Sequence, residues 1–396
     1  MSEPLGLRIR TITYFLPLHS TDREVWAGEL CAAGTFLQAA SLAFTTEGYT
    51  LQTTRVATSP LADICPPADL LQAALDLQKL AMAHGIQLIS IGPTKQAELL
   101  PVLTDIVAQT TIVSCMFALS SAFATADTKA AAEAVLRVAE ETTAEGNFRF
   151  GVAANCLPGI PFFPVAYANA HASPPAFAIG TENTAILRTA FEAAKGDMCA
   201  AEAQLRQHLT AALQPVERIA EQLAAMSAVE YRGIDASLAP GLDTPSMTGS
   251  YDCLGLGGFG SAGTLAISAL ITGVLKSLPL KLCGYSGLML PVCEDTGLAE
   301  LASQGAFRIS DLLQYSAVCG CGLDTVPVPG LQPGNFAANQ QLVSHITALL
   351  LDVTALAFRL NKPLSCRLLP IPGKTSGQMT EFANPYLVNC KIMGIP

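Results

Sequence analysis

The sequence feature that most constrains the fold is a steady alternation of short strand-like runs with helical runs along the whole chain. Residues 7–15 alternate apolar and polar positions, as a half-buried strand does. The next run begins at Thr21 and Asp22, two residues suited to capping a helix, and carries apolar residues at helical spacing as far as Gly48. About ten strand-like runs follow one another with helices between most of them, which favours an α/β fold.

The remaining elements can be placed from the same periodicities. The strands are expected at residues 7–15, 51–57, 86–91, 111–119, 148–154, 176–181, 231–238, 282–290 and 364–371, with another carrying Cys319, Cys321 and Asp324. The helices are expected at residues 21–48, 69–84, 95–108, 127–145, 183–226, 261–276, 295–304, 309–317 and 335–360. No linker-like or low-complexity segment divides the chain, so residues 1–396 are predicted to form one domain.

Composition excludes several classes of partner. The net charge of −10 is spread without a basic block, which argues against nucleic acid, because phosphate binding needs clustered Lys and Arg. No apolar run reaches the roughly 18 residues of a membrane span without a polar interruption, and the first residues do not resemble a signal peptide. Twelve cysteines without regular spacing do not indicate a disulfide framework. We therefore expect a cytoplasmic protein that binds no nucleic acid and no membrane.

The working site is expected to draw mainly on residues 251–330. Glycines are dense there, and cysteines, prolines and acids stand at the ends of short apolar runs. Glycine allows a backbone to approach a ligand closely, and functional side chains concentrate on loops held by rigid elements.

A glycine-rich loop within this region could favour an anion. Gly255, Gly257 and Gly260 match the spacing G-x-G-x-x-G, and a helix follows Ser261. A dinucleotide site also needs a strand directly before the first glycine and an acid about 20 residues further on, and both are missing. We expect no dinucleotide. The loop either caps a core helix or, through Gly260 and Ser261, cradles an anion.

Asp235 and Asp324 are the candidate functional acids. Each lies where a strand meets a loop, so the two carboxylates could converge on one cavity. Converging acids bind a divalent cation or hold cationic ligand groups, and the sequence does not decide whether a metal is bound. Glu294 and Asp295 are better explained as caps of the next helix.

Several further residues are candidates for ligand binding. Arg10 and Arg367 lie in or beside apolar strands, where an arginine needs an anionic partner from the protein or from a ligand. The others are Tyr167 in a long proline-rich loop, Ser286 in GYSGLML, and Lys374 in the last polar loop.

Cys319 is the candidate catalytic thiol. It stands at a junction between a strand and a loop, but no histidine is near in sequence to activate it, so a packing role is the alternative. The serines form no G-x-S-x-G elbow, and the five histidines form no metal-binding pattern.

The motifs RIRTITYF, YRGIDASLAP, GYSGLMLPVCED, YSAVCGCGLDTVPVPG and CRLLPIPGKTSGQMTEF resemble an uncharacterised family, the domain of unknown function 711, over nearly the whole chain. The resemblance implies a single ten-stranded α/β barrel of the pyruvate-formate-lyase-like kind, with helices packed outside. It implies no reaction. Enzymes of that fold that use a glycyl radical carry R-V-x-G-Y near the C-terminus, whereas Gly394 here stands in IMGIP, so radical chemistry is not expected.

Together these observations predict a barrel protein that binds or transforms a small polar or anionic metabolite in its lumen, without a glycyl radical. The alternative is a non-catalytic ligand-binding or self-assembling scaffold, and the sequence leaves open whether the protein is an enzyme. We also expect a homo-oligomer.

Overall fold

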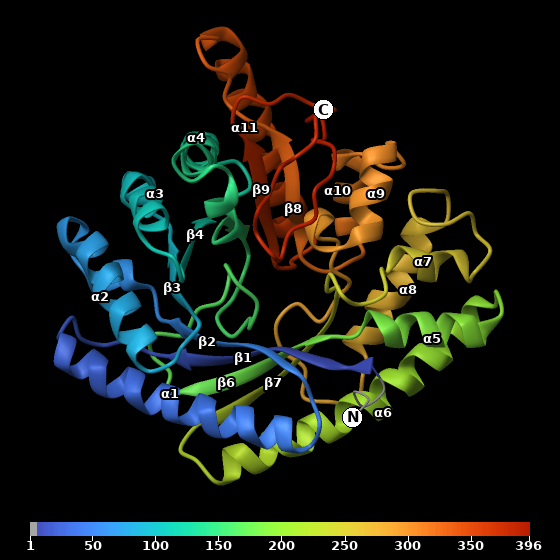
Figure 1. Cartoon of the computed structure of the whole chain (residues 1–396), viewed down its shortest axis with the longest axis horizontal. Helices are drawn as coiled ribbons and strands as arrows, with labels where there is room; N and C mark the ends of the chain where they lie inside the picture. The colour runs from blue at the N-terminus through green and yellow to red at the C-terminus, as the bar shows by residue number, and fades with distance from the viewer. Residues whose placement is uncertain (1–5) are drawn as a thin grey trace.

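The computed structural model describes residues 6–396 as a mixed α/β fold built on one nine-stranded sheet (Figure 1). The strand order across the sheet is β7-β6-β1-β2-β3-β4-β5-β9-β8. The strands are β1 (Arg8–Leu16), β2 (Leu51–Thr58), β3 (Leu88–Thr94), β4 (Val113–Leu119), β5 (Phe150–Ala154), β6 (Ala176–Glu182), β7 (Glu230–Ala239), β8 (Gly322–Pro329) and β9 (Leu364–Ile371).

The sheet contains two sets of parallel strands that run in opposite directions. Strands β1 to β5 are parallel to one another, β6 is parallel to β7, and β8 is parallel to β9. The two sets meet at the antiparallel pairs β1–β6 and β5–β9. The starts of β1 to β5 therefore lie at the same end of the sheet as the ends of β6 to β9.

Parallel neighbours need crossover connections, and helices supply most of them. Asp22 begins the first helix as predicted, because its carboxylate accepts a hydrogen bond from the Glu24 amide at 2.9 Å. The helices are α1 (Arg23–Thr46), α2 (Leu70–Ala83), α3 (Leu100–Gln109), α4 (Thr125–Thr142), α5 (Thr184–Ala194), α6 (Met198–Ala225), α7 (Thr248–Asp252), α8 (Thr264–Lys276), α9 (Thr296–Gln304), α10 (Ile309–Ser316) and α11 (Phe336–Arg359).

The strand predicted at residues 282–290 does not join the sheet as one, and the irregular segment there spans residues 282–291. It makes isolated parallel bridges to both edge strands: Leu282 and Leu288 contact β7, and Pro291 contacts β8. Gly284 and Ser286 have φ angles of +62° and +38°, which an extended strand does not tolerate. The sheet thus has nine strands and is not closed, so the predicted ten-stranded barrel is not confirmed.

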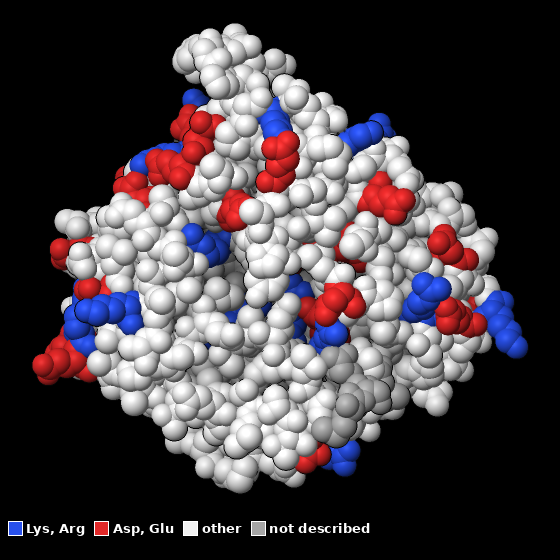
Figure 2. Space-filling model, in the orientation of Figure 1, with Lys and Arg blue, Asp and Glu red and all other residues white. Residues whose placement is uncertain are grey.

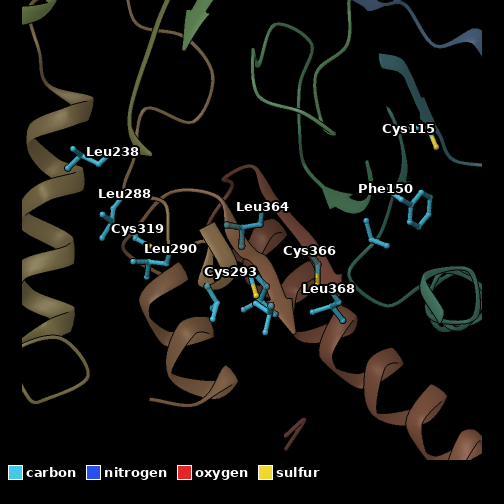
Figure 3. Packing of buried hydrophobic residues seen from close by; sticks show 14 of the residues in the cluster. Cys115, Phe150, Leu238, Leu288, Leu290, Cys293, Cys319, Leu364, Cys366 and Leu368 are labelled. Atoms are coloured by element: carbon cyan, nitrogen blue, oxygen red, sulfur yellow. The ribbon is translucent and has the colours of Figure 1, made fainter. Parts of the chain in front are cut away.

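The buried apolar residues of the described part form four hydrophobic clusters, two of which bear on the site. The larger packs the helices against the strands, and Figure 3 shows part of it, where Cys293, Cys319 and Cys366 lie among leucines as small apolar residues. A smaller cluster includes Phe162, Val165 and residues of several strands. All twelve cysteines are free.

The proline-rich loop 155–175 crosses the inner side of the sheet. Thr13 of β1 donates a hydrogen bond to the Pro161 carbonyl at 2.8 Å, and Ser90 of β3 donates one to the Ala166 carbonyl at 2.6 Å. This loop, green in Figure 1, fills part of the space that the curved sheet surrounds.

Helix α11 is the one described helix that is long and apolar enough to cross a membrane. A core helix of a soluble protein passes the same test, and α11 buries one stripe that includes Leu342, Ile346, Leu349 and Val353. That arrangement is typical of a core helix.

Candidate functional site

A cavity of about 310 Å³ lies on the inner side of the sheet, at the end where β1 to β5 begin. Residues from β1, β2, β8 and β9, the loop 155–175 and the C-terminal segment line it. In Figure 2, Lys or Arg side chains lie in a hollow near the centre of the face shown. The charged residues that line the cavity are Arg10, Arg55, Glu145, Arg149, Glu294, Asp324 and Arg367.

A buried chain of ion pairs runs along one wall of this cavity. Arg10 contacts Glu182 and Glu294, and Arg367 contacts Glu294 and Asp324, each through a nitrogen–oxygen distance of 2.6 Å. Glu294 stands at the centre and accepts from both guanidinium groups. Buried ions are tolerated when they are paired in this way.

The pKa values of the two arginines reflect these partners. Burial alone would lower the pKa of Arg367, but Asp324 and Glu294 outweigh it and raise that pKa above its ordinary value. Burial also opposes the charge of Arg10, and Glu294 and Glu182 again raise the pKa. Both side chains are therefore held as cations that already have anionic partners.

Local structure places the chain of charges. Arg10 comes from β1, at one end of the parallel strands β1 to β5, and Arg367 comes from β9, which pairs with β5 at the other end. Glu294 ends a single 3₁₀ turn, η6 (Val292–Glu294), directly after the segment that bridges β7 and β8. Asp324 lies in β8 where the register with β9 shifts, next to Thr325 with a φ of +42°.

Arg55 of β2 is different, because it has no carboxylate partner among residues 6–396. The residue is 7% exposed and lines the cavity. Its Nε donates a hydrogen bond to Thr53 Oγ1 at 2.9 Å, and its guanidinium carbon lies 5.2 Å from the centre of the Phe163 ring. Burial and the positive charges of Arg10 and Arg367 outweigh the attraction of Glu294 and lower the pKa of Arg55 to about 9. A buried cation without a directly bonded carboxylate favours the binding of an anion.

The C-terminal segment covers part of the cavity. The Tyr386 ring stacks on Phe148 with a centroid distance of 6.2 Å, and the Arg367 guanidinium carbon lies 4.7 Å from the centre of the same phenylalanine ring. The Ala383 amide donates a hydrogen bond to Glu145 at 2.8 Å. Arg149 is occupied by the backbone carbonyls of residues 107, 110 and 113.

Neutral polar groups line another part of the cavity. The Tyr285 hydroxyl donates to Ser365 Oγ at 3.1 Å, and the Ser365 hydroxyl donates to the Cys321 carbonyl at 3.1 Å. Cys156 Sγ lies 3.7 Å from the Tyr285 hydroxyl. Burial raises the pKa of the Cys156 thiol to about 12, so this thiol is protonated at neutral pH.

Three predicted site residues, Arg10, Asp324 and Arg367, are brought together at the cavity. Glu294 joins them, and the prediction that it caps a helix is wrong. Asp295 caps α9 instead, since its carboxylate accepts from the Leu298 amide at 2.9 Å.

Asp235 does not line the cavity with Asp324. Its carboxylate is fully buried and accepts hydrogen bonds from the Ser237 amide and hydroxyl and from the amides of Tyr285 and Ser286. These bonds hold the irregular segment 282–291 against β7. Ser286, another predicted ligand residue, uses its hydroxyl to donate to the Cys283 carbonyl.

Cys319 also lies outside the cavity, and it is Cys321 that contributes to the lining. Cys319 is 2% exposed, and burial raises the pKa of its thiol to about 11. Lys362 donates a hydrogen bond to the Cys319 carbonyl and not to its sulfur. This environment is that of an unreactive buried thiol.

The four remaining predicted residues have partners elsewhere in the protein. Tyr167 donates to the Cys156 carbonyl, and Lys374 donates to the Met379 carbonyl and pairs with Glu381. The Gly260 amide donates to Thr264 Oγ1, and the Ser261 hydroxyl donates to the Gly257 carbonyl, so the groups expected to cradle an anion are already used. Across residues 6–396, no group of three or more His, Cys, Asp or Glu side chains is placed to hold a metal ion.

Arg55 is the functional candidate that sequence reasoning missed. It stands in LQTTRVAT, an arginine within a strand-like run, which is the same signal that identified Arg10 and Arg367. Glu182, the last residue of β6, carries a similar signal as an acid at the end of an apolar run.

Comparison with known proteins identifies relatives over most of the chain. The family model described as Uncharacterised ACR (DUF711) matches residues 1–384. A UPF0210 protein of Pyrobaculum islandicum is 28% identical over 364 residues, which are 86% of this chain and 78% of that protein. A UPF0210 protein of Pyrobaculum arsenaticum is 26% identical over 357 residues, with the same coverage of 86% and 78%. A UPF0210 protein of Lactobacillus delbrueckii subsp. bulgaricus is 27% identical over 241 residues, which are 59% of this chain and 51% of that protein.

Proposed function

We propose that this chain, which belongs to the Uncharacterised ACR (DUF711) family, binds a small anionic metabolite in its interior cavity, with Arg55 as the residue that receives the negative charge. The names of the family and of its relatives state no ligand and no reaction. The proposal therefore rests on the cavity itself.

The observation that carries it is the unpaired charge of Arg55. Arg10 and Arg367 line the same cavity but share Glu182, Glu294 and Asp324 between them. Arg55 has a hydroxyl and an aromatic ring beside it and no carboxylate in the described part of the chain. Its planar guanidinium can donate two parallel hydrogen bonds to a carboxylate or phosphate.

The paired arginines also contribute to this preference. Burial first, and then the nearby charges of Arg10 and Arg367, lower the pKa of Arg55, and an anion bound to its guanidinium would offset both effects. Because the ion pairs hold Arg10 and Arg367 rigidly, the cavity needs little rearrangement to receive a charged ligand.

We propose in addition that the segment 282–291 serves as an irregular tenth strand and completes a pyruvate-formate-lyase-like barrel around the cavity. The bridges from this segment to β7 and β8 support the proposal, as do the hydrogen bonds from the amides of Cys283, Met289 and Gly320. These amides should exchange with deuterium as slowly as those of the central strands, and rapid exchange at them would contradict closure. Twelve free cysteines support a cytoplasmic location.

The test of anion binding is the substitution Arg55→Gln, which keeps a polar side chain and removes the charge. Thermal unfolding would be followed at constant ionic strength with a panel of carboxylates, phosphate and sulfate. A ligand at 100 times its Kd stabilises the wild type by about 2.7 kcal/mol, which corresponds to roughly 3 °C for a chain of this length. Arg55→Gln should lose that shift.

Arg137→Gln is the matched control, because Arg137 is exposed and pairs with Asp105 and Glu141 on the protein surface. This variant should keep the full anion-dependent shift. The proposal is refuted if no anion in the panel stabilises the wild type, or if Arg55→Gln responds to anions as strongly as the control does.

A further inference from the structure

We infer that the ligand is an amphipathic monocarboxylate: one carboxylate group for Arg55, attached to a compact apolar or aromatic body without a second charge. This inference rests on the proposed anion-binding function and specifies its ligand class. Three properties of the cavity lead to it, namely its charge balance, its apolar wall and its neutral polar end.

The charge balance disfavours more than one negative charge on the ligand. The three arginines of this region, Arg10, Arg55 and Arg367, are matched in number by three carboxylates, so each negative charge that a ligand brings makes the region more negative. The guanidinium groups of Arg10 and Arg367 already share three carboxylates. Arg149 and Glu145 carry opposite charges and both bond to backbone groups. Only Arg55, among the cavity arginines described here, remains uncommitted. A second negative charge on the ligand would find no free cation and would be repelled by Glu294 and Asp324.

The wall of the cavity is apolar where the body of the ligand would lie. Six residues belong both to the cavity lining and to the smaller hydrophobic cluster: Phe162, Val165, Ala239, Tyr285, Met289 and Cys321. Phe163, whose ring lies against Arg55, adds an aromatic surface directly beside the expected carboxylate. An inorganic anion such as phosphate would leave several oxygen atoms facing this wall without donors.

The volume of the cavity agrees with a ligand larger than an inorganic ion. A cavity of about 310 Å³ is at the lower end of the range for pockets that hold organic ligands. Acetate would fill only a small part of it and would leave the apolar wall in contact with water. An aromatic or branched body would remove that wall from water.

The hydroxyl groups of Tyr285 and Ser365 are the neutral polar groups of the cavity. Burial raises the pKa of Tyr285 well above its ordinary value, so the phenol stays protonated and remains able to donate or accept a hydrogen bond. A hydroxyl or carbonyl group on the ligand would suit this position, and a second carboxylate would not.

The experiment is isothermal titration calorimetry at constant ionic strength with five probes: acetate, phenylacetate, 4-hydroxyphenylacetate, 1,4-phenylenediacetate and phosphate. We expect phenylacetate to bind at least about tenfold more tightly than acetate, phosphate or the dicarboxylate, because, unlike these three, it combines one charge with an apolar body. We expect 4-hydroxyphenylacetate to bind at least as tightly as phenylacetate.

Two variants separate the head of the ligand from its body. Arg55→Gln should abolish binding of both phenylacetate and acetate. Val165→Thr, which keeps the shape of the side chain but replaces one methyl group by a hydroxyl, should weaken phenylacetate binding several-fold and leave acetate binding unchanged. Met289→Gln is a second wall variant with the same expectation, for use if Val165→Thr is too unstable to purify.

The possible failures are distinguishable. If phosphate or the dicarboxylate binds more tightly than phenylacetate and still requires Arg55, the monocarboxylate inference is overturned and anion binding stands. If phenylacetate binds equally well to Arg55→Gln, the carboxylate is not held by Arg55 and the inference is also overturned. If no probe binds to the wild type, both proposals fail.

Discussion

The strongest test of the electrostatic design is the substitution Glu294→Gln. Glu294 is 3% exposed and accepts hydrogen bonds from Arg10 and Arg367, each at 2.6 Å. Glutamine preserves the shape of the side chain but removes the negative charge that the two arginines share. Arg10 would retain Glu182, and Arg367 would retain Asp324.

The expected loss of stability follows from these contacts. Removing one partner of a buried ion pair costs about 3 to 5 kcal/mol, and the remaining carboxylates favour the lower value of about 3 kcal/mol. For 396 residues, the entropy of unfolding is about 0.8 kcal/mol per kelvin, so Tm should fall by about 4 °C. Differential scanning calorimetry measures this shift directly.

The same substitution should increase the effect of anions, because three arginines then face only two carboxylates. Glu192→Gln is the control, since Glu192 is 54% exposed and pairs with Arg188 on the surface, where a pair contributes about 0.5 kcal/mol. A Tm for Glu294→Gln within about 1 °C of that control would show that the ion-pair chain does not stabilise the fold. A destabilised variant with unchanged affinity for anions would show that Glu294 does not affect anion binding in the cavity.

Three other predictions concern pH, thiols and the buried acid. Burial and Arg10 lower the pKa of Arg55 to about 9, and an anion binds only the charged guanidinium, so anion affinity should fall about tenfold per pH unit above about pH 9 and binding should take up a proton there. Calorimetry in two buffers of different ionisation enthalpy measures both the affinity and the proton uptake. Constant affinity between about pH 8 and about pH 10 would contradict the role of Arg55. Alkylation of the native protein, followed by mass spectrometry, should label exposed Cys31 and Cys199 first and buried Cys319 slowly. Labelling of Cys319 ahead of them would make it a candidate catalytic thiol again. Asp235→Ala should lower the free energy of unfolding by about 3 kcal/mol in urea titration, because it leaves the buried amides of Tyr285 and Ser286 without acceptors, and a loss below about 1 kcal/mol would contradict that role.

Local patterns in the sequence predicted most of the strands. The expected strand at residues 364–371 coincides with β9, and that at residues 176–181 with β6 to within one residue. The strand expected at residues 282–290 is wrong, because an apolar run indicates burial but does not show the positive φ angles at Gly284 and Ser286. The antiparallel pairing of β5 with β9 joins residues more than 200 positions apart, and no local pattern carries that information.

The residues of the candidate site were also only partly predictable from local patterns. Arg10 and Arg367 were predictable because a charge in an apolar strand requires a partner nearby. Their shared partner, Glu294, could not be predicted from local patterns. It is 284 positions from Arg10 and stands next to Asp295, which satisfies the helix-capping pattern. Asp235 was assigned to ligand binding because an acid among Gly and Ser residues looks the same in sequence whether it binds a ligand or loop amides.

The chain of ion pairs also sets an order of events during synthesis. Arg10 is translated before both of its carboxylate partners, since Glu182 follows 172 positions later and Glu294 follows 284 positions later. Contacts between such distant positions form late, because closing long loops costs entropy before the contacts are made. A nascent chain that ends before residue 294 therefore carries Arg10 without one of its two carboxylates. Burying the Arg10 charge among strands β1 to β5 then costs more free energy than it does in the complete fold. The interior of the protein becomes electrically balanced only when the last third of the chain arrives, so premature termination should yield fragments that chaperones retain.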